Sequence, residues 1–317
     1  MGRIGRRHNG IGPVGCTMKV AITGASGFLG RAIVRHLMAD GHECRGLIRP
    51  DSRHAAGKPA INWVTGGLGD VEAVAALVDG ADALIHAAHD APGGGFVDPD
   101  VDVADLVERN LVATIRLVEA ARRAGVGRVV VITSGAVHDV ILPDRPLDEA
   151  HPLWPLTHYG ATKAAIEAFV SSYGRGAGLA IAAVRPTAIY GLADPVAASR
   201  WHDLVAAVAR GEAVDCRRGG KQVHADDVAR AVGLLLAAPG IHGEVYDCTD
   251  LFVAERDVAE IARAVAGIDG AIDGTAPINK NPIDCAKLRQ LGMSFGGRPQ
   301  LEATIAALVG AIRGGGR

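Results

Sequence analysis

In the segment YGATK, Tyr159 and Lys163 place a phenol and an ammonium four residues apart. On a helix this spacing puts both side chains on one face. The ammonium would stabilise the phenolate and lower the phenol pKa from its reference value of about 10, as a general acid/base for an alcohol or a ketone requires. Ser134 follows the run VVVIT, where its hydroxyl could hold a reacting oxygen. Together the three residues predict acid/base chemistry on a carbon–oxygen bond, although a Tyr-x-x-x-Lys pattern alone is common and structurally innocent.

A glycine-rich stretch, TGASGFLG, occupies residues 23–30 between a short apolar run and a helical pattern. Glycines at such a place permit a tight turn and let the backbone approach a pyrophosphate, which the helix N-terminus favours. A purely structural turn is the alternative for a lone glycine triplet. Because a strand pattern precedes the stretch and a helix pattern follows it, we predict dinucleotide binding.

Short β-branched runs alternate with longer Ala/Leu/Val segments from Met18 onward, which is the pattern of an α/β protein with a doubly wound parallel sheet. Six strands are predicted at 19–23, 43–48, 61–64, 83–86, 128–133 and 179–184, with helices at 28–40, 71–78, 101–124 and 159–173. These elements place Ser134 after the fifth strand and Tyr159 at the start of the fourth helix.

After about Arg185 the alternation of strand and helix patterns becomes less regular. We expect helices at 199–210, 226–237, 256–266 and 301–312, and a strand at 245–248. Residues 18–185 are expected to form mainly the cofactor-binding domain, and residues 186–317 mainly a smaller substrate-binding lobe with some return to the first domain. Such a lobe can close over the carboxyl ends of the strands, where ligands bind in open α/β sheets. The Pro/Gly-rich segment 91–95 is expected at the same edge of the sheet. It is a candidate lid or substrate loop, and a plain surface loop is the alternative.

The composition restricts the class of partner. The chain has 317 residues, 49% of them hydrophobic, and a net charge of -2 without a long run of one sign, so a sizeable core is possible and nucleic acid is not indicated. Charges or glycines interrupt every apolar stretch before the roughly 18 residues that a membrane span needs. Five scattered cysteines without a C-x-x-C pair predict neither disulfides nor a metal site. A small-molecule substrate and a cytoplasmic setting are expected.

Residues 1–17 are basic and glycine-rich and lack the apolar segment of a secretory signal. We expect a disordered extension, with Met18 as a possible functional start. A targeting peptide or a phosphate-binding arm is the alternative.

The ordered motifs resemble the extended short-chain dehydrogenase/reductase family, whose TGxxGxxG form matches residues 23–30. Further matches are LIHAA at 84–88, Asn110 with Thr114, GVGRVV at 125–130, TS at 133–134, the Tyr159/Lys163 pair, RPTAIYG at 185–191, VHADDVA at 223–229 and KLRQLG at 287–292. The resemblance implies a Rossmann fold of the NAD-dependent epimerase/dehydratase kind. The RPTAIYG motif resembles that of the reductase and hydroxysteroid dehydrogenase branch.

The resemblance also implies roles. Ser134 would be the catalytic serine, Tyr159 the acid/base, and Lys163 both its partner and a ribose ligand. The implied cofactor-binding residues are Gly24, Ser26, Gly27, Phe28, Leu29, Gly30, Arg49, Leu68, Ala87, Ala88, Thr133, Tyr159, Lys163 and Pro186. The family's usual adenine-binding Asp position is Gly67 here, which leaves that contact to Leu68 and the backbone, while Asp70 is expected to cap the next helix.

Cofactor choice is set at the end of the second strand, which reads Ile48-Arg49-Pro50. Arg49 resembles the arginine of NADP-using members, and Arg53 or Arg31 could assist it by a bidentate phosphate contact. We therefore predict NADP. NAD stays the alternative, because Asp51 lies next to this position and Arg49 could be a solvated surface residue.

Positions at which this sequence differs from the family's usual residues restrict the expected class of substrate. Nucleotide-sugar enzymes of the family carry an Asn where this chain has Ala188, and an Arg where it has Gly220, although Arg217, Arg218 or Lys221 could substitute for the latter. Sugar dehydratases carry acidic residues where this chain has Gly135-Ala136. Candidate substrate residues, all weaker, are His89, His138, Ala188 and Trp201.

We therefore expect an NAD(P)-dependent oxidoreductase that interconverts a secondary alcohol and a ketone or aldehyde on a small polar or sugar-like substrate. The alternatives are a sugar or nucleotide-sugar epimerase with the same three residues, and a non-catalytic NADP-sensing regulator. In the family, the helices corresponding to 101–124 and 159–173 pair across a two-fold axis, so a homodimer is expected.

Overall fold

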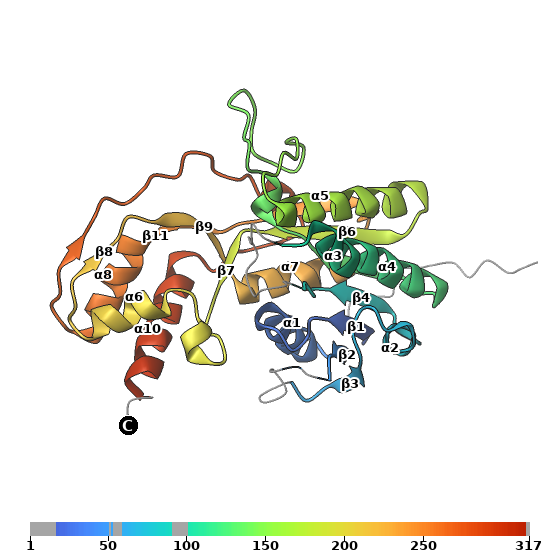
Figure 1. The fold of residues 1–317 in the computed structure, drawn as a ribbon, viewed down its shortest axis with the longest axis horizontal. Helices are drawn as coiled ribbons and strands as arrows, with labels where there is room; N and C mark the ends of the chain where they lie inside the picture. The colour runs from blue at the N-terminus through green and yellow to red at the C-terminus, as the bar shows by residue number, and fades with distance from the viewer. Residues whose placement is uncertain (1–16, 51, 53–58, 91–100, 315–317) are drawn as a thin grey trace, which may run out of the picture.

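The structure is a computed structural model that describes residues 17–50, 52, 59–90 and 101–314 (Figure 1). A sheet of seven parallel strands forms its centre, in the order β10-β6-β5-β4-β1-β2-β3. The strands are β1 (Lys19–Thr23), β2 (Glu43–Ile48), β3 (Asn62–Thr65), β4 (Ala83–His86), β5 (Arg128–Ile132), β6 (Ala180–Pro186) and β10 (Glu244–Cys248). The strand order reverses between β1 and β4, and the crevice at such a switch point is where open α/β sheets bind ligands.

Helices cover both faces of this sheet (Figure 1). Helices α1 (Phe28–Ala39) and α7 (Ala225–Ala237) pack together on one face. Helices α2 (Val71–Val78), α4 (Ala113–Arg123) and α5 (His158–Ser171) pack on the other. Along β5, Val130 and Ile132 join the first core and Val129 and Val131 the second, because successive side chains of a strand point to opposite faces.

The helix predicted at 101–124 is divided by a π-helical turn. Helix α3 (Val103–Val107) continues through the π turn η3 (Glu108–Val112) into α4. Helix α5 runs on in a similar way into the π turn η5 (Ser172–Gly176). Such turns hold an additional residue and often occur at functional sites.

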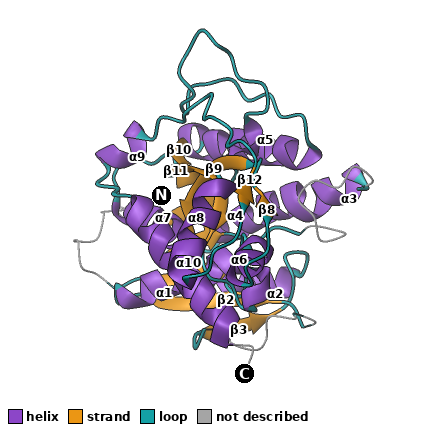
Figure 2. Cartoon of the chain, turned by 90° about the vertical axis from the view of Figure 1, so that its left-hand side faces the viewer, coloured by secondary structure: helices purple, strands orange, loops and turns teal. Residues whose placement is uncertain are grey.

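A second part of the molecule is built on a small sheet. It contains β7 (Ala188–Tyr190), β9 (Gly219–His224) and β11 (Leu251–Ala254), beside the pair β8 (Val214–Asp215) and β12 (Ile272–Asp273). Helices α6 (His202–Ala209), α8 (Glu255–Ala266) and α10 (Gly297–Gly314) share a separate apolar core there, and Figure 2 views the molecule from their side. The short turns η4 (Gly135–Val137) and η6 (Val196–Ala198) and helix α9 (Ala286–Gln290) complete the elements.

The predicted sheet of six strands was one strand short. The strand expected at 245–248 was grouped with the later part of the chain, but β10 pairs with β6 in the large sheet. Thr133 was predicted as a strand residue and lies just beyond the end of β5. The division of the chain at residue 185 stays a prediction.

Several sequence-based predictions fall outside the described residues. They are the extension at 1–17, of which Thr17 alone is described, the candidate loop at 91–95, Asp51 and Arg53. No helix in the described ranges is long and apolar enough to cross a membrane.

Candidate active site

The glycine-rich turn lets α1 start directly against the end of β1. Gly24 has a φ of +75°, a conformation that glycine adopts without strain. A Cβ on Gly24 would lie 2.7 Å from the backbone nitrogen of Ala88, and a Cβ on Gly30 would overlap the carbonyl oxygen of Gly24. Gly27 precedes α1, and no described side chain caps this helix. The N–H groups of the first turn therefore suit an anionic ligand group such as a pyrophosphate.

The other residues of the turn lie around this helix start. Phe28 is 38% exposed, whereas Leu29 packs against the first core. The carbonyl oxygen of Ser26 accepts a hydrogen bond from Nε of Arg31 at 3.0 Å, and the guanidinium of Arg31 also pairs with Asp194 at 2.8 Å. These contacts hold the Arg31 side chain beside the glycine-rich turn.

A buried histidine joins the end of β4 to its neighbours. Nδ1 of His86 is 2.6 Å from the hydroxyl of Thr23, and its Nε2 is 2.8 Å from the hydroxyl of Thr114. Burial, with a smaller effect from Lys163, lowers the pKa of His86 to about 3, so the ring is neutral. This bridge fixes Ala87 and Ala88, whose backbone lies against Gly24.

Two more predicted cofactor residues lie at the ends of β2 and β3. The Arg49 side chain is 61% exposed and its guanidinium lies 3.5 Å from the Asp90 carboxylate, which Arg109 approaches at the same distance. Leu68 is half-buried against the second core. Asp70 accepts a hydrogen bond from the N–H of Ala73 and is the predicted N-cap of α2.

The structure brings the three predicted catalytic residues together at the carboxyl end of β5. Tyr159 lies in the first turn of α5 and its phenol is hydrogen-bonded to Ser134, which precedes the turn η4. Nζ of Lys163 lies 5.8 Å from the centre of the Tyr159 ring and donates a hydrogen bond to the Ile132 carbonyl oxygen at 3.1 Å. Thr157 caps α5 by accepting from the N–H of Gly160 at 3.0 Å, which fixes where the helix begins.

The pKa of the Tyr159 phenol differs from the sequence-based expectation. In the protein alone, burial raises it above its ordinary value and the hydrogen bond with Ser134 offsets part of that rise. Burial also lowers the pKa of Lys163 to about 8, against an opposing effect of Glu167. Desolvation disfavours both charged forms, so burial outweighs the mutual stabilisation that the spacing suggested.

The two candidate histidines lie in different surroundings. The His89 ring meets the Tyr159 ring edge-on at 4.9 Å between centroids, and burial followed by the charge of Lys163 lowers the pKa of His89 to about 4. His138 is buried, and its Nε2 lies 2.9 Å from Nη1 of Arg185. His89 is placed beside the phenol, whereas His138 belongs to a buried polar cluster.

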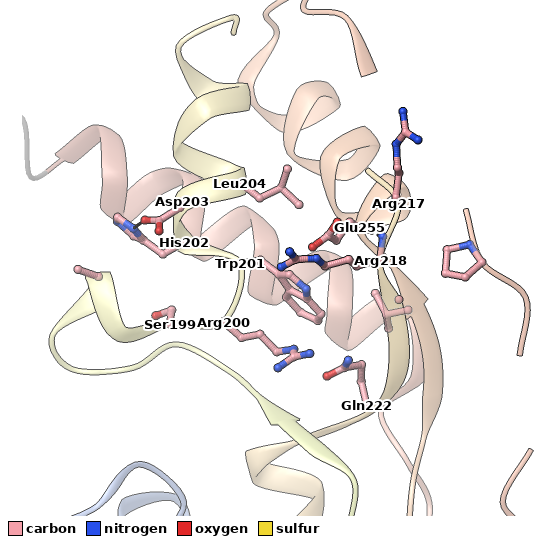
Figure 3. A pocket seen from close by; sticks show the side chains of 14 residues that line it. Ser199, Arg200, Trp201, His202, Asp203, Leu204, Arg217, Arg218, Gln222 and Glu255 are labelled. Carbon is pink, nitrogen blue, oxygen red and sulfur yellow. Dashed lines mark hydrogen bonds and ion pairs between the residues drawn. The ribbon is translucent and has the colours of Figure 1, made fainter. Parts of the chain in front are cut away.

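A cavity of about 690 Å³ opens in the second part of the molecule (Figure 3). Its lining includes Ser199, Arg200, Trp201, Arg218, Gln222 and Glu255. Trp201 has a φ of +64°, and residues other than glycine held in this conformation cost about 1–3 kcal/mol and cluster at ligand sites. The Arg200 guanidinium lies 5.3 Å from the Trp201 ring centre.

The cavity is linked to the catalytic residues along the chain. Gly135 follows Ser134, and a Cβ there would lie 3.2 Å from Cγ2 of Thr187. Ala188 begins β7 and is the register partner of Gln222 on β9. Gln222 is 1% exposed, and its Oε1 has no hydrogen-bond partner among the described residues. This buried acceptor suits a donor group on a ligand.

Thr133 and Pro186, two predicted cofactor-binding residues, lie at the carboxyl ends of β5 and β6, and neither side chain is exposed. Both are buried, and the Thr133 hydroxyl is directed to Glu167 at 2.7 Å. Glu167, Asp247 and Gln222 were not among the residues predicted from the sequence motifs. Only Glu167 carried a local signal, since it lies one further helical turn after Lys163.

Within the described ranges, no group of three or more His, Cys, Asp or Glu side chains is placed to hold a metal ion.

Comparison with known proteins agrees with this geometry. The sequence model of the NAD dependent epimerase/dehydratase family matches residues 20–248. The chain belongs to this family. It is therefore an enzyme of the extended short-chain dehydrogenase/reductase type, with the oxidoreductase chemistry of an NAD-dependent family.

Among its relatives is a ketoreductase of Stigmatella aurantiaca that acts on 4-hydroxy-2-methyl-3-oxo-4-farnesyl-3,4-dihydroquinoline-1-oxide. It is 34% identical over 246 residues, covering 74% of this chain and 68% of the relative. A 3-beta-hydroxysteroid dehydrogenase of Mycolicibacterium neoaurum is 32% identical over 56% of this chain and 49% of its own length. The chain thus spans about half the length of that relative. The structure of a Thermus thermophilus UDP-glucose 4-epimerase in complex with NAD has a TM-score of 0.75 and 26% identity, covering 94% of this chain and 99% of that one.

Proposed function

We propose that this enzyme carries out a net hydride transfer between a nicotinamide cofactor and the carbon of a secondary alcohol or a ketone or aldehyde. The observation that carries the proposal is the hydrogen bond between Tyr159 and Ser134 beside the buried ammonium of Lys163. This arrangement can bind one oxygen atom and move one proton to or from it. The same arrangement argues against a regulator that has lost catalysis.

In the direction of reduction, Ser134 holds the carbonyl oxygen and Tyr159 donates the proton that this oxygen takes up. The cofactor, when bound, supplies the hydride to the carbonyl carbon. One ketone, one hydride and one proton give one alcohol, and Tyr159 recovers its proton from solvent. The Lys163 ammonium stabilises the phenolate in between and, as the resemblance implies, contacts the ribose. Its lowered pKa of about 8 leaves it mostly protonated at neutral pH.

We propose that the cavity beside β7 and β9 holds the rest of the substrate. Arg200 and Arg218 favour a polar or anionic group there, and the Gln222 Oε1 favours a hydroxyl or an amide N–H. These preferences support a small polar or sugar-like substrate. Gln222→Leu should raise KM for the substrate while the NADPH dissociation constant stays near that of the wild type.

Net consumption of cofactor separates this proposal from an epimerase. An epimerase oxidises and re-reduces the same carbon, so reduced cofactor does not disappear with turnover. Purified enzyme with NADPH and a panel of ketones, aldehydes, aldonates and sugars should show loss of reduced nicotinamide absorbance in proportion to product. Interconversion of sugar epimers with constant absorbance would favour the alternative, which the Thermus thermophilus neighbour supports.

NADP is the proposed cofactor, with NAD as the alternative. Arg49 lies just after β2, and its side chain is 61% exposed, so its guanidinium can make a bidentate contact with a 2′-phosphate. Arg49→Ala should weaken NADPH binding by about tenfold or more and leave NADH binding nearly unchanged. Arg116→Ala is the matched control, since Arg116 is similarly exposed and pairs with Glu108. Equal weakening of both cofactors would contradict the assignment.

We also propose a reducing, cytoplasmic setting. Its support is that Cys44, Cys216, Cys248 and Cys285 are buried free thiols.

A further inference from the structure

Helix α5 contacts the end of β5 through three side chains that follow one another at helical spacing. Tyr159 meets Ser134, Lys163 donates to the carbonyl oxygen of Ile132, and Glu167 accepts from the hydroxyl of Thr133 at 2.7 Å. The last two contacts hold the two residues that immediately precede Ser134. Glu167 therefore anchors the segment that carries the catalytic hydroxyl.

Arg185 holds Glu167 in place by a bidentate ion pair. Its Nη2 lies 2.7 Å from Oε2 of Glu167 and its Nε 3.1 Å from Oε1. Its Nη1 reaches His138 at 2.9 Å and the Asp247 carboxylate at 3.3 Å. Arg185, Glu167 and Asp247 have side chains no more than 3% exposed. His138 directly follows η4, so Arg185 contacts the segment after Ser134 through His138. Glu167 contacts the residue before Ser134, which is Thr133.

Lys163 and Glu167 lie four residues apart on one face of α5, so a protonated Lys163 and an ionised Glu167 attract each other. Arg185 and Glu167 form a buried ion pair, and burial raises the pKa of the Asp247 carboxyl to about 7. Loss of the Lys163 proton would remove the attraction to Glu167 in a buried place, where water screens charges poorly. Protonation of Lys163 is thus coupled to the carboxylate one helical turn away.

We propose that Glu167, held by Arg185, is a positioning residue of the active site: it fixes the Ser134 turn through Thr133 and keeps Lys163 protonated. The positioning part rests on the proposed function, whereas the charge part does not. The other groups facing Lys163 are Tyr159 on α5, His86 at the end of β4 and His89 just after this strand, and both histidines have pKa values lowered far below neutrality. Behind Glu167 lie Arg185 on β6, His138 after η4 and Asp247 on β10. Glu167 is the carboxylate whose charge raises the pKa of Lys163.

The charge part is tested by cofactor binding alone, because Lys163 is the proposed ribose ligand. NADPH fluorescence titrations across pH should show affinity declining as Lys163 loses its proton. Glu167→Gln keeps the shape and an acceptor oxygen but removes the charge, so the decline should start about one pH unit lower. Glu119→Gln is the matched control, because this glutamate lies on α4 and pairs with the exposed Arg122 and Arg123 instead of with Arg185. An unshifted decline in a folded Glu167→Gln protein would overturn the charge part.

The positioning part is tested at Thr133, where every charge is kept. Thr133→Val removes the hydroxyl that meets Glu167 and should lower kcat by about tenfold or more, because small misplacements of a reacting group are costly. Thr133→Ser, which restores a hydroxyl, should recover most of kcat. A Thr133→Val enzyme with wild-type kcat, or a Thr133→Ser enzyme as slow as Thr133→Val, would overturn this part.

The outcomes stay distinguishable from those of the proposed function. If the wild type reduces no carbonyl compound, the proposed function fails while the cofactor titrations still decide the charge part. If Glu167→Gln does not fold, as circular dichroism would show, the two Thr133 variants decide.

Discussion

Lys163 and Ser134 have separable tasks at the scale of single residues. In the proposed mechanism, Ser134 acts on the substrate oxygen alone, whereas Lys163 stabilises the phenolate and contacts the ribose. Lys163 donates to the Ile132 carbonyl oxygen at the end of β5, and the Ser134 hydroxyl accepts from the N–H of Ala136 in η4. Mutating each should therefore affect different kinetic constants.

Ser134→Ala should lower kcat by about 10²-fold with little change in the NADPH dissociation constant, as expected for the loss of one donor to a reacting oxygen. Lys163→Ala should lower kcat and weaken NADPH binding together. Steady-state rates and fluorescence titrations measure the two effects. A Ser134→Ala enzyme with lost cofactor affinity, or a Lys163→Ala enzyme that binds NADPH normally, would reverse these assignments.

That Ser134, Tyr159 and Lys163 lie together could be predicted because their spacing is local. A Tyr-x-x-x-Lys pair after an apolar strand and a Ser at that strand's end need no knowledge of distant contacts. Arg185, Asp247 and Gln222 could not be assigned in the same way, because each meets its neighbours across strands far apart in sequence. The pKa of Tyr159 was expected in the wrong direction because sequence spacing conveys charge but not burial.

At the scale of elements, periodicity predicted nearly all strands and helices of the large sheet. It did not assign β10 to this sheet, since a short strand carries no sign of its partner. The π turn at Glu108–Val112 was also missed, because it interrupts no apolar pattern. There the Asn110 side chain donates to the carbonyl oxygens of Asp90 and Leu106, contacts that only the folded chain reveals.

His86 joins three elements and makes stability depend on pH. Its folded pKa of about 3 lies below its ordinary value of 6.5, so the unfolded chain takes up a proton first as the pH falls. The contribution of His86 to stability is complete above 6.5 and is lost as the pH falls toward 3. His89 and His138 act in the same direction, whereas Asp247, with its pKa raised to about 7, acts in the opposite one.

We expect the thermal unfolding midpoint to fall between about pH 7 and about pH 5. His86→Gln should reduce this fall, although the variant is less stable at neutral pH because the ring bridges Thr23 and Thr114. Differential scanning calorimetry at the two pH values measures both effects. An equal fall in wild type and variant would show that His86 does not carry the dependence.

At the scale of the whole molecule, we propose a homodimer through α4 and α5. Phe169 on α5 is 40% exposed, and it lines a shallow crevice with Leu111 and Tyr173 between these helices. Phe169→Glu should weaken self-association, because a charge would enter an apolar contact. Light scattering at micromolar concentration should show a dimer for the wild type and a monomer for the variant. Val265→Glu is the control, since Val265 is 44% exposed and lies on α8, outside the proposed interface. A monomeric wild type would contradict the proposal.

We propose that one part of the molecule binds the cofactor and carries the catalytic residues, while the other binds the rest of the substrate. The large sheet presents the glycine-rich turn and the Ser134, Tyr159 and Lys163 set at one edge, and the smaller sheet carries the cavity lined by Gln222 and Trp201. The central claim is that the Tyr159 phenol moves the proton that accompanies hydride transfer.

The most direct test is the rate of NADPH oxidation by Tyr159→Phe with a carbonyl substrate that the wild type reduces. The change deletes one hydroxyl and leaves the ring in contact with His89, so NADPH affinity should stay close to that of the wild type. Loss of general acid catalysis should lower kcat by about 10²–10⁴-fold. A Tyr159→Phe enzyme that oxidises NADPH at a near-normal rate would contradict the account.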